Sequence, residues 1–74
     1  MPSRRSFIEV RVGKVPGRIE KIALNGARTV DAAFETAGLD ANGEIRVNGR
    51  VVRSGSTKVK HGDTIVCIEK ITGN

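Results

Sequence analysis

The stretch TVDAAFETAGLD, residues 29–40, decides the fold class, because it is the one segment whose apolar residues recur at a helical period. Thr29 is a good N-cap for this helix, and Gly38 can adopt the left-handed conformation that ends it. The apolar stripe consists of Val30, Ala33, Phe34 and Ala37. A helix with one apolar face has to pack against another element, so the flanking segments decide the architecture.

The segments on either side of this helix alternate between apolar and polar residues, which is the period of half-buried strands. Pro16-Gly17 marks a turn between the first two strands, and Asn48-Gly49 marks a tight hairpin turn of type I′. Gly62-Asp63 marks a third turn, ahead of the most apolar strand. The expected order is β-β-α-β-β-β, with strands over residues 6–13, 18–24 and 64–71, a hairpin over 44–52 and a polar connection over 53–63.

A chain of 74 residues with this order is expected to form one small α+β domain over residues 1–74. The helix should pack across one face of a mixed sheet of four to five strands, which gives two layers. We expect a flexible basic arm over residues 1–5 and a flexible tail over residues 72–74.

The composition argues against several classes of function. A core of this size leaves little room for a deep active site, and no apolar run approaches the ~18 residues of a membrane span. Cys67 is the one cysteine, and its alternation with Ile65 predicts a buried core residue; His61 is expected at the surface of a turn. We therefore expect a cytoplasmic protein that is not an enzyme, with no catalytic residues, no metal site, no cofactor and no membrane partner.

The formal net charge of +5 is unevenly distributed along the chain. Residues 1–28 carry a net charge of +5, residues 29–45 carry −4, and residues 46–74 carry +4. The sequence thus predicts an acidic helix between basic flanks. Such flanks favour an acidic partner, either a protein or a nucleic acid.

The succession of a hairpin, one helix, a Val-Asn-Gly turn, a Gly-Asp turn and an apolar last strand resembles the ubiquitin-like β-grasp superfamily. The matching stretches are TVDAAFETAGLD (29–40), IRVNGRVV (45–52) and HGDTIVCIEKITGN (61–74). Within the superfamily they are most similar to the small sulfur-carrier branch that serves thiamin and molybdopterin synthesis. The resemblance implies a mixed sheet whose first and last strands are adjacent and parallel, and a flexible tail beyond Ile71.

The last two residues of the chain differ from the C-terminal sequence of the sulfur-carrier branch. Its carriers end in Gly-Gly, and an activating enzyme adenylates the terminal carboxylate before sulfur is added. Gly73 stands here at the first of the two positions and Asn74 at the second, where it adds a Cβ next to the carboxylate that must react. A divergent sulfur carrier acting through Gly73 and Asn74, with an activating enzyme as partner, is therefore the alternative function and not the leading one.

The leading hypothesis is a non-enzymatic protein–protein interaction module. If Ile65 and Cys67 face the helix, alternation turns an apolar centre with a basic rim toward the opposite face of the sheet. The resemblance points to the same face, because ubiquitin-like proteins commonly bind partners through it. The expected contact residues are Phe7, Ile19, Val66 and Ile68, with Arg11, Lys21 and Lys70 at the rim.

RNA binding by the basic flanks is the second alternative. The stretch VNGRVVRSGSTKVKHGDTI (47–65) looks like the strand half of a small RNA-binding module found in a ribosomal protein and in pseudouridine synthases. That module grips RNA with two basic helices ahead of the Val-Asn-Gly turn, whereas the helix here carries Asp31 and Glu35 and no Lys or Arg. A closer nucleic-acid analogy is the β-grasp domain appended to some tRNA synthetases and GTPases. The residues expected to contact phosphates are Arg46, Arg50, Arg53, Lys58 and Lys60.

Overall fold

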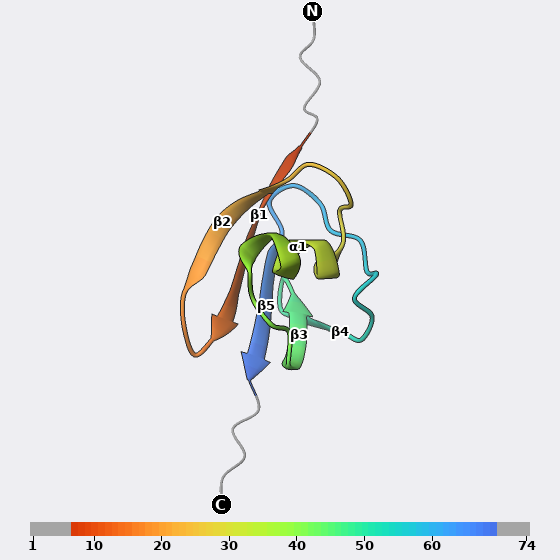
Figure 1. The fold of residues 1–74 in the computed structure, drawn as a ribbon. Helices are drawn as coiled ribbons and strands as arrows, with labels where there is room; N and C mark the ends of the chain where they lie inside the picture. Colours follow the sequence, from red (N-terminus) through yellow and green to blue (C-terminus); the bar gives the residue numbers. More distant parts are fainter. Residues whose placement is uncertain (1–6, 70–74) are drawn as a thin grey trace, which may run out of the picture.

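The computed structural model describes residues 7–69, which form five strands and one helix (Figure 1). The strands are β1 (Ile8–Val15), β2 (Ile19–Leu24), β3 (Gly43–Val47), β4 (Arg50–Val52) and β5 (Thr64–Glu69), and the helix is α1 (Val30–Ala37). The order β-β-α-β-β-β is the one expected from the sequence. The main difference at an element boundary is in β1, which continues to Val15 although clean alternation ends at Gly13.

The five strands form one mixed sheet in the order β2-β1-β5-β3-β4. β1 and β5 are parallel neighbours, with Val12 opposite Ile65, and the other neighbouring strands are antiparallel. Parallel strands need a long crossover connection, and here this connection contains α1. Figure 1 shows α1 lying across one face of the sheet, which leaves the other face without a covering element in the described part of the chain.

α1 begins and ends at the residues that its sequence predicts. The Oγ1 of Thr29 accepts a hydrogen bond from the backbone N–H of Ala32 at 3.2 Å. Gly38 has a φ of +72°, and its N–H bonds back to the carbonyl of Glu35 at 3.1 Å. Both ends of the helix are thus closed by local contacts.

The core lies between α1 and the sheet, and every buried side chain of the described residues is apolar. Phe34 of α1 and Val59 of the polar connection pack into it. The buried position predicted for Cys67 is confirmed, with an exposed fraction of 0%, and Val59 is 4% exposed. The largest fully buried side chains are Leu24, Ile65, Val10, Val12, Val30 and Cys67.

The fold-class prediction needs a correction. The structure supports a small α+β domain made of a five-stranded mixed sheet and one short helix, and it does not show the more specific ubiquitin-like β-grasp assignment. That assignment rested on the order of elements and on three turn motifs. Each of these motifs is set by local backbone geometry, so it is open to more than one family of small α+β domains.

Within residues 7–69, α1 is the one helix, and it is far shorter than a membrane-spanning segment.

Candidate nucleic-acid interface

Two turns meet at one end of the sheet. The first is Asn48-Gly49, between β3 and β4, and the second covers residues 60–63, just before β5. The side-chain amide of Asn48 donates a hydrogen bond to Oδ1 of Asp63 at 2.9 Å, and its Oδ1 accepts one from the N–H of Thr64 at 2.9 Å. The backbone N–H of Asn48 also donates to the carbonyl of Thr64 at 2.8 Å. These contacts hold the β3–β4 hairpin against the start of β5.

The local sequence explains both turns. Asn48 and Gly49 have φ of +53° and +86°, as a type I′ turn requires, which confirms the turn predicted from the Asn-Gly pair. Asp63 closes the second turn, because its Oδ2 accepts a hydrogen bond from the N–H of Lys60 at 2.8 Å. The N–H of Asp63 donates to the carbonyl of Lys60 at 3.0 Å, and Gly62 supplies a φ of +90°.

The connection between the two turns is fastened to the first turn of α1. The N–H of Asp31 donates to the carbonyl of Gly55 at 2.9 Å, and that of Val30 donates to the carbonyl of Thr57 at 3.0 Å. Lys58 lies beside Thr29 in an isolated bridge. Helix N–H groups that have no partner within the helix are thereby satisfied, and the connection takes a defined position.

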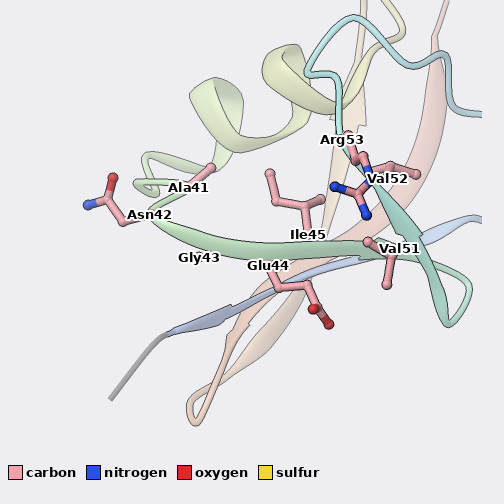
Figure 2. A pocket seen from close by; sticks show the side chains of 8 residues that line it. All are labelled: Ala41, Asn42, Gly43, Glu44, Ile45, Val51, Val52 and Arg53. Carbon is pink, nitrogen blue, oxygen red and sulfur yellow. The ribbon is translucent and has the colours of Figure 1, made fainter. Parts of the chain in front are cut away.

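Five basic side chains are carried by β3, β4, the connection and the turn 60–63, and we call them together the basic surface. Arg46 belongs to the sheet face opposite α1, whereas Arg53 lies on the side that faces α1 (Figure 2). The members are Arg46, Arg50, Arg53, Lys58 and Lys60. Arg46 is half-buried and the other four are exposed. Arg46 Nε donates to Oε2 of Glu44 at 2.6 Å. Within residues 7–69 the other four make no salt bridge, so their charges are available to an external anion.

The β3–β4 hairpin also borders an open groove of about 660 Å³. Figure 2 shows Ile45 and Arg53 on the side of the hairpin that faces α1, with Glu44 and Val51 on the opposite side. The residues that line the groove are Ala41, Asn42, Gly43, Glu44, Ile45, Val51, Val52 and Arg53.

The outward face of α1 has the opposite charge. Asp31, Glu35 and Asp40 are exposed, and residues 29–45 contain no Lys or Arg. A phosphate backbone would be repelled there and attracted to the basic surface. The acidic and basic residues nevertheless adjoin at the first turn of α1, because the carboxylate of Asp31 lies against Gly55 of the connection.

Of the residues expected to form a protein contact, Ile19, Val66 and Ile68 lie on the sheet face opposite α1. Gly13 lies between Ile19 and Val66 in the sheet, and Arg46 follows Val66 in the next strand. Ile19 is 47% exposed, whereas Phe7, Val66 and Ile68 are half-buried. Two further exposed apolar residues, Val15 and Val51, were not expected there.

The predicted basic rim of the protein contact and the predicted tail residues are only partly described by the structure. Arg11 and Lys21 are exposed and stand directly opposite each other on β1 and β2. Lys70, Gly73 and Asn74 lie outside the described residues. Among residues 7–69, no three side chains of His, Cys, Asp or Glu gather in a way that could hold a metal ion.

The family model of the S4 domain, an RNA-binding domain, matches residues 41–65, which is about one third of the chain. This segment contains β3, β4, the connection and the first residues of β5. All five members of the basic surface lie inside it. A search of the curated proteins finds no match to the chain.

The match corrects the family prediction. No comparison supports a ubiquitin-like assignment or the sulfur-carrier branch for thiamin and molybdopterin synthesis, and the matched family is a different one. The leading hypothesis of a protein–protein interaction module likewise has no support from the comparisons, which favour the RNA-binding alternative. An RNA-binding module is not catalytic, so the match is compatible with the expectation that the protein is not an enzyme.

Proposed function

We propose that this protein binds RNA through the basic surface, with Arg46, Arg50, Arg53, Lys58 and Lys60 contacting backbone phosphates. The observation that carries the proposal is that these five side chains all fall within the segment 41–65 matched by the S4 family model. The segment holds five Lys and Arg against Glu44 and Asp63, a net charge of +3. Electrostatic attraction of this kind supplies most of the affinity of a protein for nucleic acid without sequence preference.

The rigid framework behind the charges supports the proposal. The bonds of Asn48 and Asp63 join the two turns, and the bonds to the first turn of α1 fix the connection between them. Long basic side chains on a fixed backbone lose less freedom on binding than they would on a mobile loop, which favours affinity.

We infer a folded, double-stranded RNA as the ligand from the aromatic content of the chain and from the charge of its helix. Phe34 is buried and Phe7 is half-buried, and the chain contains no Tyr or Trp, so it offers little for unstacked bases to stack on. The one helix of the described part is acidic on its exposed side and cannot serve to read base edges beside phosphates. With base stacking and base-edge reading both disfavoured, the binding mode that is left is contact with the phosphates and riboses of a folded, double-stranded RNA. Such contacts depend on the shape of the RNA more than on its sequence.

The experiment is a binding titration with a short RNA hairpin and with a single strand of equal length. The hairpin should bind more tightly, and its affinity should fall as salt rises. The variant Arg53→Gln should weaken binding roughly three- to tenfold at low salt, because one phosphate contact is lost. The control is Arg18→Gln, which removes the same charge from the β1–β2 turn, on the side of the sheet away from the edge strand β4 (Figure 1). Binding that is absent, or that is reduced equally by both variants, would contradict the proposal.

A further inference from the structure

The described residues contain a second basic site, outside the segment that matches the S4 model. It is a hollow of about 320 Å³ next to the turn 60–63, which we call the β1–β2 hollow. Three separate segments build it: β1, β2 and the turn. Its lining residues are Glu9, Val10, Arg11, Lys21, His61 and Gly62.

Two like charges face each other in this hollow. Arg11 and Lys21 are directly opposite on antiparallel strands, and both are exposed. Like charges at such positions repel each other and destabilise the strand pair. Within residues 7–69 neither side chain makes a salt bridge. An anion placed between them would remove the repulsion and would gain two charge-assisted hydrogen bonds.

His61 adds a third donor. Its Nδ1 accepts a hydrogen bond from the backbone N–H of Glu9 at 3.0 Å. In a neutral imidazole the other nitrogen, Nε2, then carries the hydrogen and is the donor. The turn is held in place by two further bonds, from the N–H of Gly62 to the carbonyl of Glu9 at 2.8 Å and from the N–H of Arg11 to the carbonyl of Asp63 at 2.9 Å.

The balance of charge in the hollow indicates the kind of anion. Arg11 and Lys21 are opposed by the carboxylate of Glu9, so the lining carries a net charge of +1 with His61 neutral. The nearby carboxylate of Asp63 is occupied by the N–H of Lys60 and the amide of Asn48. A net charge of +1 matches a phosphodiester group, which carries one negative charge, and matches a phosphate dianion less well.

The hollow also continues the basic surface. His61 follows Lys60 in the chain, and the carbonyl of Asp63 bonds to the N–H of Arg11, so the turn 60–63 borders both sites. The turn 60–63 is therefore the element through which one RNA backbone would contact both sites.

We propose that the β1–β2 hollow binds one phosphodiester group of the RNA, held by Arg11, Lys21 and His61. This inference rests on the proposed function and extends the RNA-binding surface from the S4-matching segment onto β1 and β2. It also assigns Arg11 and Lys21 to RNA in place of the protein contact expected from the sequence.

The test measures hairpin-RNA affinity at several salt concentrations for Arg11→Gln, Lys21→Gln and the control Arg18→Gln. All three remove one positive charge from the β1–β2 hairpin, but Arg18 does not line the hollow. The two hollow variants should each bind about tenfold more weakly at about 50 mM salt, and the slope of log affinity against log salt should become shallower by roughly 1. Arg18→Gln should stay within about twofold of the wild type, and the unfolding midpoint of each variant checks that it is folded.

A nuclear magnetic resonance titration locates the contact. The amide signals of Glu9, Arg11 and Gly62 should shift when the hairpin RNA is added to the wild type, and these shifts should shrink in Lys21→Gln. Inorganic phosphate at the same phosphate concentration should leave them nearly unchanged. Equal shifts with inorganic phosphate, and RNA affinity insensitive to the hollow variants, would identify a site for free phosphate and overturn the inference.

The two proposals fail in different ways. If Arg11→Gln and Lys21→Gln bind RNA as Arg18→Gln does while Arg53→Gln binds weakly, the inference about the hollow is wrong and the proposed function stands. If the wild type binds no RNA, the proposed function is wrong and the inference falls with it.

Discussion

The side-chain amide of Asn48 donates a hydrogen bond to the carboxylate of Asp63 at 2.9 Å, across 15 residues of sequence. This contact joins the β3–β4 turn to the turn before β5. Arg50 follows the first turn and Lys60 begins the second, so both residues lie at the same end of the sheet. The basic surface is therefore a consequence of tertiary structure. Its members are spread over residues 46–60 in the sequence.

Removing the side chain of Asn48 should loosen this end of the sheet. Asn48→Gly keeps the positive φ that the turn needs but loses the hydrogen bonds to Asp63 and Thr64. Because each bond contributes about 0.5–1.5 kcal/mol, the free energy of unfolding should fall by about 1–3 kcal/mol. RNA affinity should fall as well, because Arg50 and Lys60 are no longer held together. Urea denaturation and RNA titration measure the two effects.

A matched control is Asn42→Gly, which replaces an exposed Asn ahead of β3 that makes no side-chain hydrogen bond within residues 7–69. It should change the free energy of unfolding by less than about 0.5 kcal/mol. Equal stability losses in the two variants would show that the Asn48–Asp63 contact contributes little.

The acidic face of α1 should lie outside the RNA contact. Glu35 is exposed and makes no salt bridge within residues 7–69, so Glu35→Gln changes the charge without breaking an ion pair. RNA affinity should rise by less than about threefold, through weaker long-range repulsion alone, and this gain should vanish at high salt. A loss of affinity in this variant would instead place RNA on α1.

The backbones of β1 and β2 pack so closely at Gly13 that a side chain there should destabilise the protein. A Cβ added there would collide with the carbonyl oxygen of Arg18 and the Cα of Ile19, and both are backbone atoms that cannot swing away. Gly13→Ala should therefore destabilise the protein by about 1–3 kcal/mol, as overpacking usually does. Gly26→Ala is the control, because no atom lies within 4 Å of its added Cβ. Thermal or urea unfolding of the two variants, side by side, measures the difference, and similar midpoints would contradict the packing seen at Gly13.

The thiol of Cys67 should behave as a core group without a chemical role. It is fully buried, so it should react with a thiol reagent only as fast as the protein opens. Cys67→Ser places a hydroxyl in the apolar core and should cost about 1–3 kcal/mol of stability, more than Cys67→Ala at the same position. Fast labelling of the native protein, or a Ser variant as stable as the Ala variant, would show that the site is open to water.

The features that sequence analysis predicted correctly are those set by neighbouring residues. Thr29 and Gly38 bound the helix because capping is a contact over three or four residues. Asn48-Gly49 specified its turn through the backbone freedom of those two residues. The burial of Cys67 followed from its alternation with Ile65 in the apolar strand β5.

The features that sequence analysis did not predict correctly depend on contacts between residues far apart in the chain, or on a choice between partners of similar chemistry. The superfamily was wrong because the order of elements and the turn motifs do not by themselves separate small α+β families. The Asn48–Asp63 bond exists only once β3 is aligned with β5, and the hollow between Arg11, Lys21 and His61 exists only once β1, β2 and the turn 60–63 come together. Exposed arginines and lysines suit an acidic protein and RNA equally, so charge alone could not choose between them.

The most direct test of RNA binding through the basic surface is the salt dependence of hairpin-RNA affinity for the wild type and for the triple variant Arg50→Gln/Arg53→Gln/Lys58→Gln. These three residues make no salt bridge within residues 7–69, so the variant should remain folded. We predict a wild-type slope of log affinity against log salt of roughly −3 to −5, and a slope shallower by roughly 2–3 in the variant, because about 0.7–0.9 is lost for each phosphate contact. Identical slopes for the two folded proteins, or no RNA binding by the wild type at low salt, would contradict the account.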